Sequence, residues 1–102
     1  GRGTAVKPEF LVVAPGWTVD PPAGAVLVVF GERLETPSDA LLSRCAEVVV
    51  VRRSGGFLAL RAAVQQSVKK WRPAAAQLHG SEMARCAADC APAKTTIVGQ
   101  SA

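Results

Sequence analysis

Arginine and glycine residues meet in this sequence where a strand is expected to end. Arg52 and Arg53 directly follow the apolar run Val48–Val51, and Gly55-Gly56 comes after one intervening serine. Cations attract anionic ligands, and glycines let the backbone approach a ligand closely. In open α/β sheets, ligands bind where a parallel strand gives way to the next helix. These residues are the first candidates for a binding site, although Gly55-Gly56 also fits a plain turn.

Cysteine and histidine form a second group. Cys86 and Cys90 lie four residues apart, and His79 precedes Cys86 by seven residues. A zinc site would need a fourth ligand and usually has a two-residue spacing between its cysteines. We therefore predict no metal site and interpret this segment as a polar helix. The odd number of cysteines, with Cys45 as a small buried residue, indicates reduced thiols and an intracellular, reducing location, either mitochondrial or cytoplasmic.

The elements that position these residues follow from the apolar pattern. Ala25–Phe30 and Val48–Val51 contain no polar residue, as parallel strands covered on both faces require. Thr36-Pro37-Ser38-Asp39 supplies capping hydroxyls and an early proline, which predicts a helix over 37–45. A second helix is predicted over 56–71, where large apolar residues recur at helical spacing. The fold class is therefore α/β, with a mainly parallel sheet and flanking helices.

The two ends of the chain are less strongly patterned. Phe10–Ala14 predicts a third strand, which ends before a Pro-Gly turn. After Pro73 the sequence is rich in alanine, so weak helix is predicted over 74–90 and a tail from residue 91. The predicted organisation is an N-terminal extension over 1–8, an α/β domain over 9–73, and a helical extension with a tail over 74–102.

Composition restricts the partners that this chain can have. Its 102 residues have room for one core, and no apolar run is long enough to cross a bilayer, so no membrane partner is predicted. The net charge of +4 suits a polyanion, although a solvated basic helix face would give the same balance. The cations responsible lie mostly in one region: Arg52, Arg53, Arg61, Lys69, Lys70 and Arg72.

An ordered set of residues in the middle of the chain resembles a known family. The set comprises Val29-Phe30-Gly31, Ser38, Leu41-Leu42-x-x-Cys45, Val49-x-Val51, Gly55 and Leu60. It resembles, without a gap, the C-terminal half of the SpoU-type RNA ribose 2′-O-methyltransferases of the SPOUT superfamily. The resemblance covers about half of the chain and implies an α/β trefoil-knot fold that forms homodimers.

The resemblance also implies where S-adenosylmethionine would be held. In the family the cofactor lies against three loops, which correspond here to Gly31–Thr36, Val51–Gly55 and Phe57–Ala62. The resemblance thus gives six cofactor-binding candidates: Phe30, Gly31, Glu32, Val51, Gly55 and Leu60.

The departures from the family fall on these loops. Glu32-Arg33 replaces the family's Asn-Glu, Val51-Arg52-Arg53 replaces Ile-Pro-Met, and Ala59-Leu60-Arg61 replaces Ser-Leu-Asn. Positions that build strands and helix cores are kept, whereas positions associated with chemistry are replaced. We assign no catalytic residue, and we expect binding of S-adenosylmethionine to be weak or lost.

The sequence therefore favours a catalytically degenerate homologue that binds RNA, either rRNA or tRNA, or a ribonucleoprotein. A homodimer or a partner chain is compatible with this hypothesis. One alternative is an active methyltransferase whose remaining half lies outside these residues, and another is an unrelated small α/β accessory subunit of a larger complex. The RNA-binding candidates are Arg33, Arg52, Arg53 and Arg61.

Overall fold

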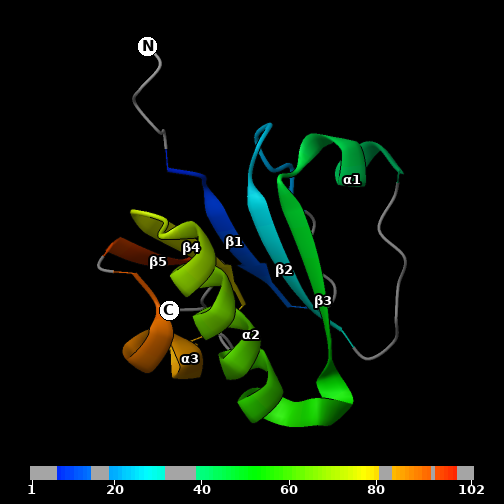
Figure 1. The fold of residues 1–102 in the computed structure, drawn as a ribbon. Coiled ribbons are helices and arrows are strands. Elements are labelled where there is room, and N and C mark those ends of the chain that lie inside the picture. The colour runs from blue at the N-terminus through cyan, green and yellow to red at the C-terminus, as the bar shows by residue number, and fades with distance from the viewer. Residues whose placement is uncertain (1–6, 15–18, 32–38, 81–83, 93, 99–102) are drawn as a thin grey trace.

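The chain forms one parallel sheet with helices packed against it (Figure 1). The computed structural model describes residues 7–14, 19–31, 39–80, 84–92 and 94–98. Along the described chain the elements are β1 (Phe10–Val13), β2 (Val26–Gly31), α1 (Asp39–Arg44), β3 (Glu47–Arg52), the 3-10 turn η1 (Arg53–Gly55), α2 (Gly56–Trp71), β4 (Ala75–His79), α3 (Ala84–Cys90) and β5 (Lys94–Val98). Within the described residues, no helix has the length and apolar character needed to cross a membrane.

The sheet has the order β3-β2-β1-β4-β5, and every pair of neighbouring strands is parallel. The first strand lies at the centre, where Val12 is opposite both Val28 of β2 and Leu78 of β4. The chain builds β2 and β3 on one side of β1 and then crosses through α2 to add β4 and β5 on the other side. This is the strand order of doubly wound α/β folds. The predicted α/β class with a parallel sheet is confirmed, including the strands expected at Phe10–Ala14, Ala25–Phe30 and Val48–Val51.

The two faces of the sheet carry separate apolar clusters. Leu60 and Val64 of α2 and Cys86 and Cys90 of α3 pack on the face to which Phe30 also contributes. The opposite face is covered in part by α1 and the residue after it, through Leu41 and Cys45. Helices α2 and α3 therefore lie side by side on one face, at the lower left in Figure 1.

The C-terminal third differs from its predicted structure. Residues 75–79 form β4 rather than helix, and the described part of α3 runs from Ala84 to Cys90. The expected tail contains β5, which pairs with β4 from Ala75 opposite Lys94 to His79 opposite Val98. The prediction was wrong because alanine favours helix intrinsically, whereas here strand pairing on both sides of β4 outweighs that preference. Residues predicted as an extension thus complete the sheet.

The predicted helix over 37–45 corresponds to α1, whose described part runs from Asp39 to Arg44. Residues 37 and 38, which carry the predicted helix start, lie outside the described residues. The second predicted helix corresponds to α2, with the same bounds. It ends at Arg72, whose left-handed backbone (φ 49°) donates its N–H to the Val68 carbonyl.

Candidate functional site

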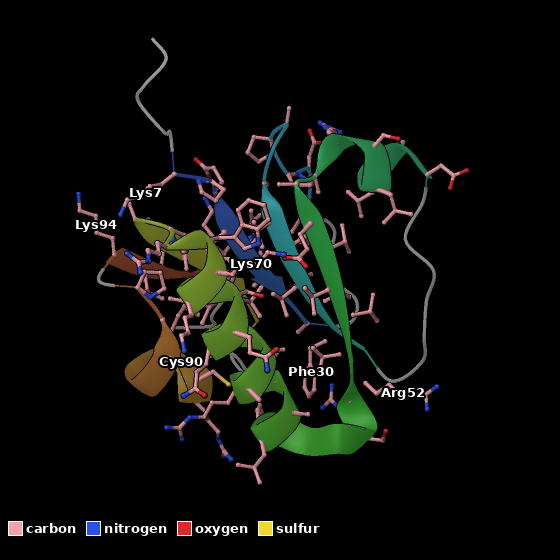
Figure 2. All side chains as sticks on the ribbon, viewed as in Figure 1. Lys7, Phe30, Arg52, Lys70, Cys90 and Lys94 are labelled. Carbon is pink, nitrogen blue, oxygen red and sulfur yellow. The ribbon has the colours of Figure 1, made fainter. Side chains whose placement is uncertain are left out.

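The carboxyl edge of the sheet gathers the ends of all the strands, because the strands are parallel. Here β2 ends at Gly31, β3 ends at Arg52 and β4 ends at His79. Helix α2 begins at the same edge, directly after η1. Figure 2 shows Arg52 and Phe30 together at this end of the sheet, with Lys7 and Lys94 at the other end. We refer to the first end as the carboxyl edge and to the other as the amino edge.

A row of four side chains, with two phenylalanines between two arginines, crosses the carboxyl edge. The guanidinium carbon of Arg53 lies 5.8 Å from the centre of the Phe30 ring, and that of Arg85 lies 5.5 Å from the centre of the Phe57 ring. The two rings are themselves 6.0 Å apart, centre to centre. These are cation–π and aromatic pair distances. The row joins η1, β2, α2 and α3, and it places one guanidinium group at each end.

Three of the four predicted RNA-binding residues lie in the described part of the chain. Arg52 is exposed and Arg53 is half-buried, and the two are consecutive at the carboxyl edge. Arg61 is half-buried on α2, four residues after Phe57, so both lie on one side of that helix. Arg33 lies outside the described residues.

Arg85 belongs to the same group, but the sequence analysis did not identify it. Its place beside Phe57 depends on the packing of α3 against α2, which brings together residues far apart in the chain. In the sequence Arg85 is recognisable only as an arginine in a predicted helical segment. That position does not distinguish Arg85 from any other exposed arginine.

The residues predicted to bind cofactor are largely core residues. Phe30, Val51 and Leu60 are 2%, 8% and 0% exposed, and all three belong to the cluster beneath α2. Gly31 is buried at the end of β2, and Glu32 lies outside the described residues. Packing between the sheet and α2 explains why Phe30, Val51 and Leu60 are buried.

The glycine pair after η1 shapes the start of α2. Gly56 has a left-handed φ of 73°, which favours glycine strongly. At Gly55 an added Cβ would come within 2.8 Å of the Ala59 Cβ, so a side chain there would press on the first turn of the helix. Both glycines are therefore required by the turn, whether or not a ligand approaches.

The sheet also has a switch point, between β1 and β4. The Ala14 N–H donates to the His79 carbonyl at 3.1 Å, so the two strands stay paired to their ends. His79 is half-buried, and burial lowers the pKa of its imidazole below the ordinary value. Ligands of doubly wound folds bind beyond such a point. The segments that follow these strands, residues 15–18 and 81–83, lie outside the described residues.

The three cysteines are buried as thiols and form no disulfide. Cys90 donates its S–H to the Cys86 carbonyl at 2.8 Å, and both residues are buried. Among the residues that the structure describes, no group of three or more His, Cys, Asp or Glu side chains is placed to hold a metal ion. Burial raises the pKa of the Cys45 thiol, with Arg44 opposing that shift, so Cys45 is not an activated nucleophile.

At the amino edge, Glu47 ties the end of α2 to β3. Its carboxylate accepts a hydrogen bond from the Trp71 indole N–H at 2.6 Å and lies 3.5 Å from the Lys70 ammonium. The indole hydrogen bond lowers the pKa of Glu47 from its ordinary value of 4.5, against an opposing effect of burial, and Lys70 lowers the pKa further. The carboxylate form is therefore favoured in the folded protein.

We expect this contact to make stability depend on pH in the acid range. Because the folded pKa of Glu47 is lowered, its stabilising contribution is complete above about pH 4.5 and is lost as the pH falls through the folded pKa. Glu47→Gln should be less stable than the parent protein at neutral pH, and the difference should shrink at lower pH. Thermal melts from about pH 7 to pH 2 measure this, with exposed Glu9→Gln as the control. A difference that stays constant across this range would contradict the expectation.

No family model, curated protein or solved structure matches this chain. Function must therefore be inferred from the geometry of the molecule. At the carboxyl edge that geometry is a group of arginines fixed on aromatic rings where strands end and a long helix begins.

Proposed function

We propose that the carboxyl edge binds the phosphates of RNA, and that the chain is a catalytically degenerate SpoU-like factor acting on rRNA, tRNA or a ribonucleoprotein. The arginine–phenylalanine row is the observation that carries this proposal, because it holds Arg53 and Arg85 against aromatic rings at the carboxyl edge. Arginine presents several donors in a planar fork that matches phosphate oxygens. Exposed Arg52 adds a third cation next to the row.

The backbone supports the same electrostatics. Helix α2 has 16 residues and begins at the carboxyl edge, with no acidic residue in its first turn. Its N-terminal N–H groups therefore add a partial positive charge beside the arginines. Nonspecific affinity for RNA comes mainly from such phosphate contacts.

The loss of catalysis is part of the proposal. Methyl transfer from S-adenosylmethionine requires a bound sulfonium cation, and arginines beside the glycine turn disfavour a cation there. No residue is assigned as an acid or base for the ribose hydroxyl. We propose that S-adenosylmethionine binds weakly or not at all, and micromolar binding in a calorimetric titration would favour the active methyltransferase instead.

Replacement of Arg52 and Arg53 together by alanine should weaken RNA binding and reduce its dependence on salt. Each lost phosphate contact should lower the salt slope by about 0.7 to 0.9. The matched control is Lys69→Ala with Lys70→Ala, because these two cations lie at the far end of α2, about 20 Å away at 1.5 Å per residue. Arg85→Ala should weaken binding in the same way as the Arg52 and Arg53 changes. Fluorescence anisotropy with a labelled single strand and a labelled hairpin, at several salt concentrations, measures all of these.

Two results would contradict the proposal. If the Arg52 and Arg53 double variant and the Lys69 and Lys70 double variant lost RNA affinity equally, RNA would be attracted diffusely to a basic protein and not bound at one site. No loss from either pair would favour the accessory-subunit alternative, in which the chain binds protein.

A further inference from the structure

A cavity at the amino edge, opposite the proposed RNA contact, has the features of a small-ligand site. Its volume is about 740 Å³, which falls within the range of small-molecule sites. It lies where the end of α2, the start of β1 and the turn before β2 meet, so three separate segments form its wall. Its lining includes Lys7, Glu9, Trp71 and Arg72.

Trp71 gives the cavity a fixed aromatic surface. The indole N–H donates to Glu47 at 2.6 Å, and the half-buried ring packs against the core cluster. The Lys70 ammonium lies 5.3 Å from the ring centre, and because its side chain is 63% exposed, a ring that displaced it would leave the ammonium in water. An aromatic ring held in this way is a stacking surface for another planar ring, because little freedom is lost when the second ring binds.

Charged groups beside Trp71 define the rest of the ligand. Lys7 and Arg72 are exposed cations that line the cavity, and Arg72 is itself the left-handed residue at which α2 ends. The positive charges of Lys7 and Arg72 complement the negative charge of a phosphate group. Glu9 is the acidic residue in the lining, and its carboxylate can accept hydrogen bonds from hydroxyl or amino groups. A fatty acid offers no such donors, whereas a nucleoside offers several.

We propose that this cavity binds a nucleoside monophosphate, with the base against Trp71, the phosphate at Lys7 and Arg72, and ribose or base donors at Glu9. The same chemistry is present in a free nucleotide and in the 5′-terminal nucleotide of an RNA strand. The inference goes beyond the proposed function, because none of these residues lies at the carboxyl edge.

AMP is the probe for the test, and the emission of Trp71 is the readout. Trp17→Phe leaves Trp71 as the single tryptophan of the chain. AMP should change its emission in a saturable way, and adenosine and ribose 5-phosphate should each bind more weakly than AMP. Arg72→Ala and Lys7→Ala should each lower the affinity for AMP about tenfold, as expected for a lost charge-assisted hydrogen bond.

Lys94→Ala is the matched control, since Lys94 lies at the same end of the molecule but does not line the cavity (Figure 2). The affinity for AMP should be unchanged in that variant and in the Arg52 and Arg53 double variant, even if RNA binding at the carboxyl edge fails its own test. Tighter binding of a 5′-phosphorylated RNA strand than of AMP, with the same loss in Arg72→Ala, would support the site and identify an RNA end as the source. No saturable change with either probe, or an equal loss in Lys94→Ala, would overturn the proposal.

Discussion

Leu60→Ala should lower the free energy of unfolding by about 2 to 5 kcal/mol, the usual cost of truncating a fully buried leucine. Leu60 is 0% exposed and lies between α2 and the sheet, so the lost methyl groups leave a cavity in the core. Leu58, two residues earlier in the same helix, is 82% exposed. The same truncation at Leu58 should change stability by less than about 0.5 kcal/mol.

Chemical denaturation followed by circular dichroism measures both variants. The pair matters because the family resemblance assigns Leu60 to a cofactor loop, whereas its burial assigns it to the core. If Leu60→Ala folded as stably as Leu58→Ala, the packing of α2 described above would be wrong.

Leu78→Glu should prevent the protein from folding, whereas Gln77→Glu should be tolerated. Leu78 is 3% exposed in β4, which lies between β1 and β5, and an unpaired carboxylate there would lose its hydration. The cost of several kcal/mol is comparable with the total stability of a small domain, about 5 to 15 kcal/mol. Gln77 is exposed on the opposite face of the same strand, so a carboxylate at that position stays hydrated.

Near-ultraviolet circular dichroism and amide exchange distinguish a folded variant from an unfolded one. The neighbouring pair also tests whether residues 75–79 form a strand. If residues 74–90 formed a loose helical extension, both changes would be mild and similar. A cooperative melt of Leu78→Glu close to that of the parent protein would contradict the central place of β4.

The strands that the sequence predicted well share one property, which is an apolar side chain at every position, although Val48, Val49 and Val50 of the edge strand β3 are only half-buried. Ala25–Phe30 and Val48–Val51 are continuous apolar runs, and such runs have few interpretations in a short soluble chain. Helix α2 was equally clear, because its apolar residues repeat with helical spacing over 16 residues.

Strand β4 escaped prediction because its composition and its pattern disagree. Ala75, Ala76 and the alanine before them favour helix, while buried Ala76 and Leu78 alternate with exposed Ala75 and Gln77 as in a strand. Three or four residues of alternation are too few to outweigh alanine by sequence alone. Residues 75–79 form a strand because they pair with β1 and β5, and that pairing depends on the tertiary fold rather than on the local sequence.

The candidate site was predictable only as far as it is local in sequence. Arg52, Arg53 and the glycines after them could be placed at a strand end from their neighbours along the chain. The contact of Arg85 with Phe57 and the cavity beside Trp71 each join distant segments. The contact and the cavity therefore become visible only in the three-dimensional structure.

The position of β1 affects how the protein can fold during its synthesis. This strand is made first but lies at the centre of the sheet, and one of its two edges stays unpaired until residues 75–79 have been added. A ribosome therefore releases an apolar strand, Phe10 to Val13, with half of its backbone partners not yet translated. Parallel pairing across such a long sequence interval folds slowly. We therefore expect a nascent chain in which β4 has not yet been translated to expose this edge of β1. Such a chain should depend on chaperones until β4 and β5 emerge.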